Sequence, residues 1–456
     1  MAKKIKAPSG MRDFLPDELR KRKYVIKIIS DIYEKHGFSP LETPSMERLS
    51  LLLDKYGDEG EKLVFKIMKR GDKLARALAD GKNESELADM GLRYDLTVPL
   101  ARVYSNNRHQ LTGTFKRYQI QPVWRADRPA RGRFREFYQC DVDIIGSSHF
   151  FAELDIFLAV CEIMDKLNFS DYFLSLNDRN LLSAILKGFA CPAELETSVL
   201  TTLDKLDKIG VKGVVGELES KELPDGLQEK LKDYVTAMAE VKDEGNQAVL
   251  EKFSIFIRGF NDSSALKYLE KIEKIMTIFS ELGYADRLIF DPLLARGLDY
   301  YTGSIFELKI GEEKSSFGGG GRYDNLIGDI GGQQVAAVGF SFGLERIIDH
   351  LLAKEMLEIE HGVDLCLACL DEKYFTYAAK VAAIFRNQEI KVDFYPRKRS
   401  PSKIFRWASK KGIPRVVLIG GDEVTEKKIT VKNFSTGKFV EIKLDKIDDF
   451  IKKIKT

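Results

Sequence analysis

Five arginines fall within eleven positions of one short stretch of the chain. Guanidinium groups that meet on a tight loop repel one another unless an anion lies between them, and their planar forks match pairs of phosphate oxygens. A nucleoside triphosphate would therefore suit this loop, although a loop of simply solvated arginines is the alternative. The residues are Arg125, Arg128, Arg131, Arg133 and Arg135, in WRADRPARGRFREF.

Carboxylates and an amide follow these arginines at every second position. Gln139, Asp141 and Asp143 alternate with apolar residues in FYQCDVDII, so on a strand they would share one face. Acids there could bind a metal, or they could accept a hydrogen bond from an amino or imidazole N–H group. The wet side of an ordinary antiparallel sheet has the same pattern, so that alternative stays open.

A further arginine stands where an anion would be useful. In VGFSFGLER a strand is expected to run into a helix that begins near Leu344, which places Arg346 in the first turn of that helix. An arginine there opposes the helix dipole, a mild local cost that a bound anion would offset. An ion pair on the surface with Glu345 or another acid is the alternative.

Aromatic and glycine-rich stretches complete the polar set. RGLDYYTG places Arg296, Tyr300 and Tyr301 near the start of a strand, although paired tyrosines more often pack in a core or at its rim. FGGGGRYD contains no GxGxxG, and the chain contains no GxxxxGK[ST], so neither a Rossmann site nor a P-loop is indicated. The glycines would permit close approach of a flat ligand or a neighbouring strand, or a flexible turn.

Potential metal ligands show no familiar spacing. Cys366 and Cys369 form a CxxC, but VDLCLACL is typical of a strand, on which these two side chains face opposite ways. The five histidines form no metal-binding pattern either. We therefore expect no zinc and no other metal site built from protein ligands alone.

Hydrophobic periodicity predicts the elements that position these residues. A helix is expected from about Pro16 to Lys35, and two antiparallel strands are expected within 114–145, on either side of the loop ADRPARG. The alternation would also place Arg125 and Arg133 on the polar faces of these strands. From about 178 to 286 the sequence is charged and strongly helical, which indicates an inserted helical domain. In one of its helices the expected buried face is Leu266, Leu269, Ile272, Met276, Phe279 and Leu282.

Charge is distributed unevenly along the chain of 456 residues. Between 362 and 456 there are 21 lysines and arginines against 12 aspartates and glutamates, an excess of nine, whereas the net charge of the whole chain is only +2. Strand and helix patterns alternate in this segment, which predicts a small domain with a partly parallel sheet. Its basic balance suggests a polyanionic partner, although many basic surfaces are merely solvated.

Composition excludes several classes of protein. With 44% hydrophobic and 31% charged residues the chain is typical of a soluble protein of two or three domains. No segment has the length and apolarity of a membrane span, and no signal peptide is apparent. Five scattered cysteines do not suggest a disulfide framework, so we expect a cytoplasmic protein with no membrane partner.

Taken together, these stretches resemble the histidyl-tRNA synthetases, which are class II aminoacyl-tRNA synthetases, over essentially the whole chain. The segment around Pro44 is similar to motif 1, FKRYQIQPVWRADRPARGRFREFYQCDVDIIG to motif 2, and AVGFSFGLERI to motif 3. LRYDLTVPLAR, ARGLDYYTG and GGGGRYD are similar to signatures specific to the histidine enzymes. Such a set in the right order is far more specific than any single motif.

The resemblance implies a role for each candidate. Arg125 would hold the α-phosphate of ATP, and Arg133 and Arg346 would hold the β- and γ-phosphates beside Mg²⁺. Arg296 would lie near the histidine carboxylate and the α-phosphate and assist the chemistry together with Arg125. Many bacterial members have Glu at two histidine-binding positions where this chain has Asp, so these shorter acids would reach the substrate from a shifted backbone or through water. The residues implied to bind histidine are Asp95, Thr97, Gln139, Asp143, Arg296, Tyr300 and Tyr301.

The resemblance also implies a fold and partners. We expect an α+β catalytic domain built on an antiparallel sheet (1–178 and 286–352), a helical insertion domain (179–285), a linker (353–361) and a C-terminal α/β anticodon-binding domain (362–456). The implied reaction joins L-histidine to tRNA(His) through a histidyl-adenylate formed from ATP, in a homodimer. The rivals are the synthetase-like regulatory subunit of ATP phosphoribosyltransferase and a non-catalytic tRNA-binding sensor.

Overall fold

The structure, a computed structural model, divides into two compact units, each described here by itself. The larger unit comprises Met1–Leu15 and Arg22–Met356, and the smaller comprises Pro16–Lys21 and Leu357–Thr456. Arg131, part of the expected linker (358–361) and part of the basic C-terminal segment (396–398) lie outside the described residues. The described residues are 5–455 except 54–61, 112, 131, 225, 261–262, 297–299, 314, 358–361 and 396–398.

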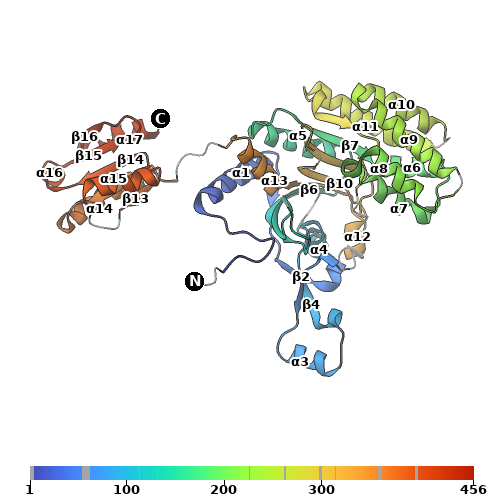
Figure 1. Ribbon diagram of the computed structural model, residues 1–456, viewed down its shortest axis with the longest axis horizontal. Helices are drawn as coiled ribbons and strands as arrows, with labels where there is room; N and C mark the ends of the chain where they lie inside the picture. The colour runs from blue at the N-terminus through green and yellow to red at the C-terminus, as the bar shows by residue number, and fades with distance from the viewer. Residues whose placement is uncertain are drawn as a thin grey trace. The chain divides into compact units, whose positions relative to one another are not determined.

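An eight-stranded sheet forms the centre of the larger unit (Figure 1). Its inner strands pair antiparallel, and only the two edge strands run parallel to their neighbours. The expected α+β fold on an antiparallel sheet is therefore confirmed. In sheet order the strands are β1 Ser39–Pro40, β5 Phe115–Trp124, β6 Glu136–Ile145, β11 Ala337–Gly343, β10 Gly318–Arg322, β9 Ser304–Ile310, β7 Tyr172–Asp178 and β8 Leu288–Phe290.

The predicted hairpin is confirmed as β5 and β6, in which Arg117 pairs with Asp143 and both polar faces point the same way. The observed strands are shorter than expected, and Arg125 and Arg133 lie outside them. Regular strand pairing ends where Trp124 meets Glu136, although the N–H of Arg125 still donates to the carbonyl oxygen of Arg135 at 2.9 Å. Both arginines therefore lie in the connection, where their side chains are not bound to alternate.

The glycine run is the strand β10 rather than a turn. A Cβ on Gly320 would lie 2.0 Å from the carbonyl oxygen of Gly339 and 2.7 Å from the ring of Phe306. Close approach of neighbouring strands and of aromatic rings is thus what these glycines permit.

Helices cover the sheet and continue its strands. On the sheet face that Phe306 occupies, its ring meets Phe157 of α5 with centroids 4.8 Å apart, and α5 is buried along most of its length. The helix predicted over Pro16–Lys35 is observed with those bounds, preceded by no side-chain cap but begun by a proline, which suits a first turn. The helices here are α1 Pro16–Lys35, α4 Thr97–Asn107, α5 Phe151–Lys166, α12 Leu326–Gly331 and α13 Leu344–Ala353.

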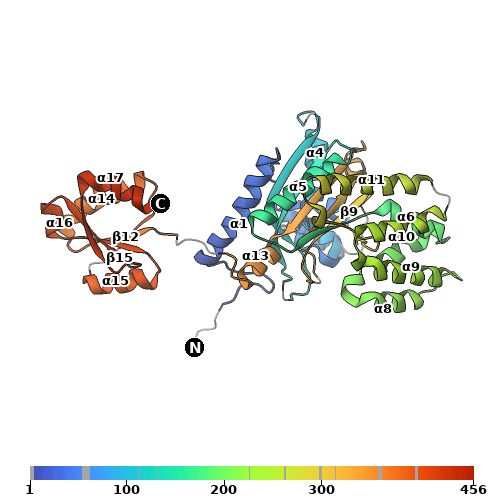
Figure 2. The ribbon, with the colours of Figure 1, turned by 90° about the horizontal axis from the view of Figure 1, so that it is seen from above.

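The predicted helical insertion follows β7 and precedes β8, and Figure 2 shows its helices gathered as one bundle. Its expected buried face was partly wrong, because Leu266 and Leu282 are exposed whereas Ala265 and Ile275 face the core with Leu269. A face of residues spaced by three and four can be shifted by one position, and only packing against neighbours decides which shift is used. The helices are α6 Arg179–Gly188, α7 Ala193–Leu203, α8 Leu206–Glu219, α9 Leu227–Val241, α10 Asn246–Arg258 and α11 Ser263–Glu281, with the 3₁₀ turns Lys242–Glu244 and Ala285–Arg287.

A buried carboxylate joins this insertion to the sheet. Glu153 of α5 is fully buried and accepts hydrogen bonds from Arg322 of β10 at 2.9 and 2.6 Å, from Lys271 of α11 at 2.9 Å and from Ser304 of β9 at 3.0 Å. Burial alone would raise the pKa of Glu153, but Arg322 and Lys271 outweigh burial and hold it at about 2. Glu153 is therefore ionised and fully paired.

A small three-stranded sheet forms an arm of the larger unit, visible in Figure 1 around β2 and β4. Leu49, Leu52 and Tyr94 contribute to its separate apolar cluster. Its elements are β2 Met46–Arg48, β4 Ala88–Leu92, β3 Lys66–Met68, α3 Asp72–Ala79 and the 3₁₀ turn Glu84–Leu87.

The smaller unit contains a five-stranded sheet that is parallel at one side and antiparallel at the other, as predicted. Cys369 packs in the apolar cluster of one face and Cys366 in that of the other, so they point apart as expected for a strand. The strands in order are β13 Val392–Phe394, β12 Leu365–Cys369, β14 Arg415–Ile419, β15 Lys428–Asn433 and β16 Phe439–Lys443. The helices are α14 Phe375–Asn387, α15 Pro401–Lys410, α16 Gly421–Thr425 and α17 Ile447–Lys455, with 3₁₀ turns Glu372–Tyr374 and Leu444–Lys446. Within the described residues of the chain, no helix has both the length and the apolarity of a membrane span.

Candidate active site

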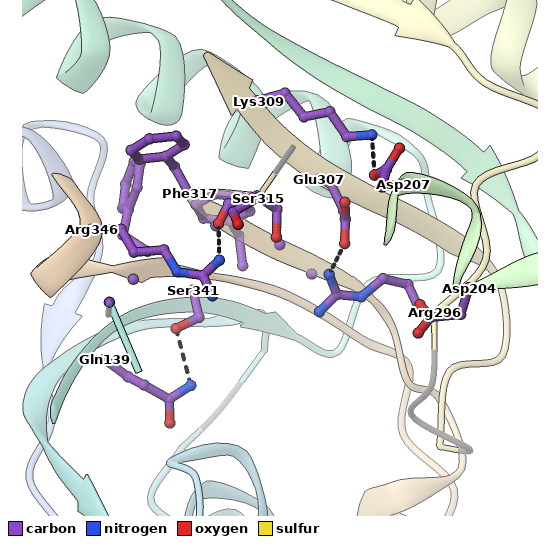
Figure 3. A pocket seen from close by; sticks show the side chains of 18 of the residues that line it. Gln139, Asp204, Asp207, Arg296, Glu307, Lys309, Ser315, Phe317, Ser341 and Arg346 are labelled. Carbon is purple, nitrogen blue, oxygen red and sulfur yellow. Dashed lines mark hydrogen bonds and ion pairs between the residues drawn. The ribbon is translucent and has the colours of Figure 1, made fainter. Parts of the chain in front are cut away.

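One cavity of about 1440 Å³ lies over the polar face of the eight-stranded sheet (Figure 3). Its walls come from the β5–β6 connection, from β6 and β9–β11, from the start of α13 and from the helical insertion. The tertiary fold thus brings together segments that lie far apart in the sequence. Every residue expected to bind ATP or histidine lines this cavity: Asp95, Thr97, Arg125, Arg133, Gln139, Asp143, Arg296, Tyr300, Tyr301 and Arg346.

Strand register arranges the floor of the cavity in rows. Residues at every second position of β6 share one face, and their partners on β5 and β11 share it too. The row through Asp143 holds Arg117 and Gly339, the row through Asp141 holds Gln119 and Ser341, and the row through Gln139 holds Gln121 and Gly343.

Asp143 is held from both sides. Tyr323 donates to its Oδ1 at 2.5 Å, and the fully buried Arg117 lies 2.8 Å from its Oδ2. Burial raises the pKa of Asp143, while Arg117 and Tyr323 oppose that rise. A Cβ on Gly339 would lie 1.9 Å from Asp143 Oδ1, so only glycine there leaves room for this carboxylate.

Asp141 is buried beside it but is less well paired. The side chain is 3% exposed, its Oδ2 lies 3.9 Å from Arg117, and no described residue hydrogen-bonds to its Oδ1. Burial raises the pKa of Asp141 to about 7, and Arg117 only partly offsets this effect. The guanidinium of Arg117 thus lies beside these acids, where the sequence alone also allowed a metal ion. This favours the other interpretation, in which the acids accept hydrogen bonds from an N–H group.

Gln139 also presents a free acceptor. Its Nε2 donates to Ser341 Oγ at 3.2 Å (Figure 3), while its Oε1 is buried and bonded to no described residue. Ser341 in turn hydrogen-bonds to Asp141. This serine fixes the orientation of both side chains, and sequence analysis missed it, although it alternates with Gly339 and Gly343 in VGFSFG.

The end of the cavity near Asp143 is lined by tyrosines. Tyr301 is 7% exposed, and its ring lies 4.9 Å from that of Tyr300. A Cβ on Gly321 would lie 2.7 Å from the ring of Tyr301, so this glycine makes space for the tyrosine. Asp95 lies nearby in the wall, where its Oδ1 accepts the N–H of Thr97 at 3.0 Å and steadies the start of α4.

Only part of the arginine loop faces the cavity. The guanidinium of Arg125 stacks 4.2 Å from the centre of the Tyr94 ring and donates from Nε to the Tyr94 carbonyl oxygen at 3.2 Å. Arg133 lies 3.3 Å from Asp127 and keeps 62% of its side chain exposed. Arg128 is exposed and is not among the lining residues, so the expected convergence holds for two of these arginines and not for Arg128.

Arg346 lies across from this loop, in the first turn of α13. It donates to the carbonyl oxygen of Ser316 at 2.5 Å. Burial lowers the pKa of Arg346, and the positive charge of Arg133 lowers it further. Two guanidiniums that repel each other across a cavity are an anion-binding arrangement.

The alternative role for Arg346, an ion pair with Glu345, is contradicted by the structure. Glu345 points away and accepts from Arg22 at 2.6 and 2.7 Å and from Arg12 at 2.6 Å. Its Oε1 also accepts the backbone N–H of Tyr138 at 3.2 Å. Glu345 therefore anchors the start of α13 to α1 and β6 and leaves Arg346 to the cavity.

Arg296 crosses the sheet surface to reach β9, where it pairs with Glu307 (Figure 3). A Cβ on Gly319 would lie 2.5 Å from Arg296 Nη1, so the glycine of the neighbouring strand leaves space for the guanidinium. Sequence analysis missed Glu307, which lines the cavity. The one local signal for it is its place in a strand, two positions after Ile305.

The helical insertion closes another side of the cavity. Asp207 at the start of α8 pairs with Lys309 of β9 at 2.6 Å, and Asp204 lies beside Arg296 (Figure 3). Nothing local in the sequence indicates this contact, because about a hundred positions separate its partners.

The described residues contain no group of three or more His, Cys, Asp or Glu side chains that could hold a metal ion. Mg²⁺ is usually bound through substrate phosphates and water with one or two carboxylates, so a group of three is not needed for a metal that enters with ATP. Glu307 is a carboxylate in the wall that could contribute one oxygen.

Comparisons with known proteins point to one family over most of the chain. A family model described as histidyl-tRNA synthetase matches residues 10–347, and one described as an anticodon binding domain matches residues 364–454. A histidine--tRNA ligase of Phocaeicola vulgatus is 38% identical over 96% of this chain and 96% of its own length. One of Cytophaga hutchinsonii is 38% identical over 96% of this chain and 98% of its own.

Solved structures give the same picture at the level of the fold. The histidyl-tRNA synthetase of a Nostoc species aligns over 99% of both chains with a TM-score of 0.82 and 28% identity. A Bacillus halodurans protein described as an ATP phosphoribosyltransferase regulatory subunit/histidyl-tRNA synthetase aligns over 91% of this chain and 98% of its own, with a TM-score of 0.73 and 18% identity. At that identity the second likeness shows the fold alone.

Proposed function

The chain belongs to the histidyl-tRNA synthetase family, and on that premise we propose how its own residues attach histidine to tRNA. The reaction is that of an aminoacyl-tRNA ligase, with ATP as the energy source. The observation that carries the proposed residue roles is the convergence of all ten expected residues on one cavity.

The proposed reaction has two steps. A carboxylate oxygen of histidine attacks the α-phosphorus of ATP, and the bond to the bridging oxygen breaks, which yields histidyl-adenylate and pyrophosphate. A ribose hydroxyl at the end of tRNA(His) then attacks the acyl carbon and displaces AMP. Because charge develops on phosphate oxygens in the first step, fixed cationic groups are the main contribution that the protein can make.

Arg125 and Arg296 are the proposed catalytic residues. Stacking on Tyr94 holds the guanidinium of Arg125 in one orientation before ATP arrives, which spares the cost of ordering it during the reaction. Arg296 is held in the same way by Glu307. We assign Arg125 to the α-phosphate and Arg296 to the junction of the α-phosphate and the histidine carboxylate.

Arg133 and Arg346 are the proposed ligands of the β- and γ-phosphates. Arg133 is largely exposed and Arg346 is half-buried, and an anion between them would relieve their repulsion. Mg²⁺ would enter with ATP and screen the charge of the phosphates, held by phosphate oxygens and water and by no more than one or two carboxylates such as Glu307.

Histidine is proposed to lie with its imidazole towards Asp143 and Tyr301, beside Tyr300. An imidazole offers one donor and one acceptor, and this pocket can pair both, so an amino acid without them would leave buried groups unpaired. Such a loss gives roughly 10⁴-fold discrimination without an editing step. Asp95, Thr97 and Gln139 are assigned to the amino group.

The smaller unit and the insertion are proposed to bind tRNA. The match to an anticodon binding domain and the excess of basic residues support an anticodon-binding domain over 362–456, after a linker at 353–361. We assign 1–178 and 286–352 to the catalytic domain and 179–285 to an insertion that contacts the acceptor stem. A homodimer, and a cytoplasmic location with five free cysteines, complete the proposal.

Exchange of labelled pyrophosphate into ATP tests the proposal. We expect exchange with histidine and with none of the other amino acids, and we expect Arg296→Ala to reduce it at least about a hundredfold while histidine still binds. Histidine binding without exchange in the native chain would favour the regulatory or sensor rivals. Full activity of the variant would remove Arg296 from the assignment.

A further inference from the structure

We propose that Asp141 binds the α-ammonium group of histidine, together with Gln139. This inference rests on the proposed function and adds a residue that the family resemblance did not supply. It makes a buried carboxylate of this chain a determinant of substrate choice.

Three buried acceptor atoms on one face of β6 have no hydrogen-bond donor within the described residues, and two of them also lack an ion pair, since Oδ2 of Asp143 lies 2.8 Å from Arg117. These two atoms are Oδ1 of Asp141 and Oε1 of Gln139, and both residues line the cavity. Leaving a buried acceptor without a donor destabilises the folded state, so the presence of two such atoms indicates a ligand that supplies the donors. Because the two residues are two positions apart on a strand, their Cα atoms lie about 6.6 Å apart, a span that one ammonium group can bridge.

The charge of the ligand follows from the pairing. One guanidinium, that of Arg117, faces both Asp141 and Asp143, and it is 2.8 Å from the second but 3.9 Å from the first. Tyr323 satisfies the other oxygen of Asp143. Asp141 is therefore the carboxylate that is left to an incoming cation, and the floor carries one negative charge more than Arg117 can balance.

The row order places the amino group of histidine at Asp141. In the proposed pose the imidazole lies in the row of Asp143, and the carboxylate points past Gln139 towards the α-phosphate that Arg125 holds. The row between them is that of Asp141 and Ser341. The α-carbon lies between the imidazole and the carboxylate in histidine, so the ammonium group attached to it falls over this middle row.

Other groups around Asp141 do not supply the missing donor. Ser341 donates to this side chain, but Oδ1 stays without a partner among the described residues. Burial raises the pKa of Asp141 to about 7, as expected for a carboxylate that awaits its counter-ion. The titratable and charged groups that act on it are Tyr33 on α1, Arg93 and Asp95 after β4, Arg117 on β5, Cys140 and Asp143 on β6, Tyr301 before β9 and Tyr323 after β10.

Two ligands that differ at the amino group test the proposal. Histidinol keeps the ammonium and the imidazole but lacks the carboxylate, whereas imidazolepropionate lacks only the amino group. Their dissociation constants are measured by calorimetry at pH 8, where Asp141 is ionised, for the native chain and for Asp141→Asn. Glu313→Gln is the matched control, because it removes one negative charge from a side chain in the cavity wall that has no assigned role.

We expect Asp141→Asn to weaken histidinol about tenfold or more, since a charged hydrogen bond is lost, and to change imidazolepropionate less than about threefold. The control should change neither. Equal weakening of both ligands, or unchanged binding of histidinol, would overturn the role of Asp141. If the native chain binds no histidine at all, the proposed function fails instead.

A crystal structure of the native chain with histidine gives a test that does not depend on how the variant folds. The ammonium nitrogen should lie within about 3.2 Å of an oxygen of Asp141 and of Gln139 Oε1. A nitrogen more than about 4 Å from both oxygens of Asp141 would contradict the inference, even if histidine occupies the cavity.

Discussion

The two sheets of this protein differ in whether they bury charged side chains. The eight-stranded sheet buries Arg117, Asp141, Asp143, Glu153 and Arg322, whereas every buried side chain in the described part of the smaller unit is apolar. Desolvated charges are strong and specific, but they must be matched one by one. Exposed charges are weaker, are screened by salt and suit a long polyanion. The difference supports the proposal that one chain separates the recognition of two small substrates from the recognition of tRNA.

Glu153→Gln should produce the largest effect. It removes the main counter-charge of two cations and leaves the buried Arg322 with Asp324 at 3.3 Å and Lys271 with Asp178 at 3.8 Å, so we expect unfolding to become easier by about 3 kcal/mol. Denaturant unfolding measures this change. Glu162, on the same helix, pairs near the surface with Lys35. Glu162→Gln should therefore lower the free energy of unfolding by less than about 1 kcal/mol. Equal losses for the two variants would mean that burial does not distinguish these ion pairs.

The pH dependence of Glu153 follows from its lowered pKa. Because the folded-state pKa is about 2 and therefore below the usual value, the stabilisation is present above about pH 4.5 and is lost as the pH falls towards 2. Glu153→Gln should lack this part of the acid transition.

Arg125→Ala should have the next largest effect. It removes a guanidinium preorganised on Tyr94, and we expect pyrophosphate exchange to fall about a hundredfold or more without loss of stability. Arg128→Ala, in the same loop but outside the cavity, is the control and should stay within about twofold. Similar losses in both variants would show that the loop binds phosphate by its summed charge and that orientation contributes little.

Substitutions on α15 test the other side of the comparison. Lys403, Arg406 and Lys410 are exposed on this helix, and replacing all three by Ala should weaken tRNA binding about tenfold at low salt. The slope of log affinity against log salt should also become shallower, while histidine-dependent pyrophosphate exchange, which needs no tRNA, stays unchanged. The control is the same replacement of Lys446, in the 3₁₀ turn before α17, and of Lys452 and Lys453 on α17. An altered exchange rate would mean that the two units are not separate in function.

Asp141→Asn should change stability less than Glu153→Gln does, and the sign of the change is opposite. The folded-state pKa of Asp141 is raised to about 7, so the carboxylate favours folding when protonated, and this contribution is lost as the pH rises through 7. The variant without ligand should therefore be more stable than the native chain at pH 8, by about 1–3 kcal/mol, and similar to it at pH 4. Thermal melts at both pH values measure this difference, and a variant that is less stable at pH 8 would contradict it.

Local pattern was enough for the elements and for the membership of the site. Alternation over two residues predicted β5 and β6 with Asp141 and Asp143 on a common face, since strand geometry depends on neighbours in sequence. Motif order then selected ten residues, and all of them line one cavity. The ends of the strands and the exposed position of Arg128 were not predictable, because backbone pairing, and not side-chain pattern, decides where a ladder stops.

The sequence by itself determined which side chains are available, that Gln139, Asp141 and Asp143 lie on one face of a strand, and that the basic excess belongs to the C-terminal part. Only the tertiary structure decided their partners. Tyr323 and Arg117 satisfy Asp143, Glu345 turns towards Arg22, and Asp207 reaches Lys309. These contacts join positions far apart in the chain. Whether a carboxylate stays unpaired can therefore be decided only once the positions of all its neighbours are known. Periodicity cannot reveal such a group, because pairing of a buried charge is a property of the packed interior.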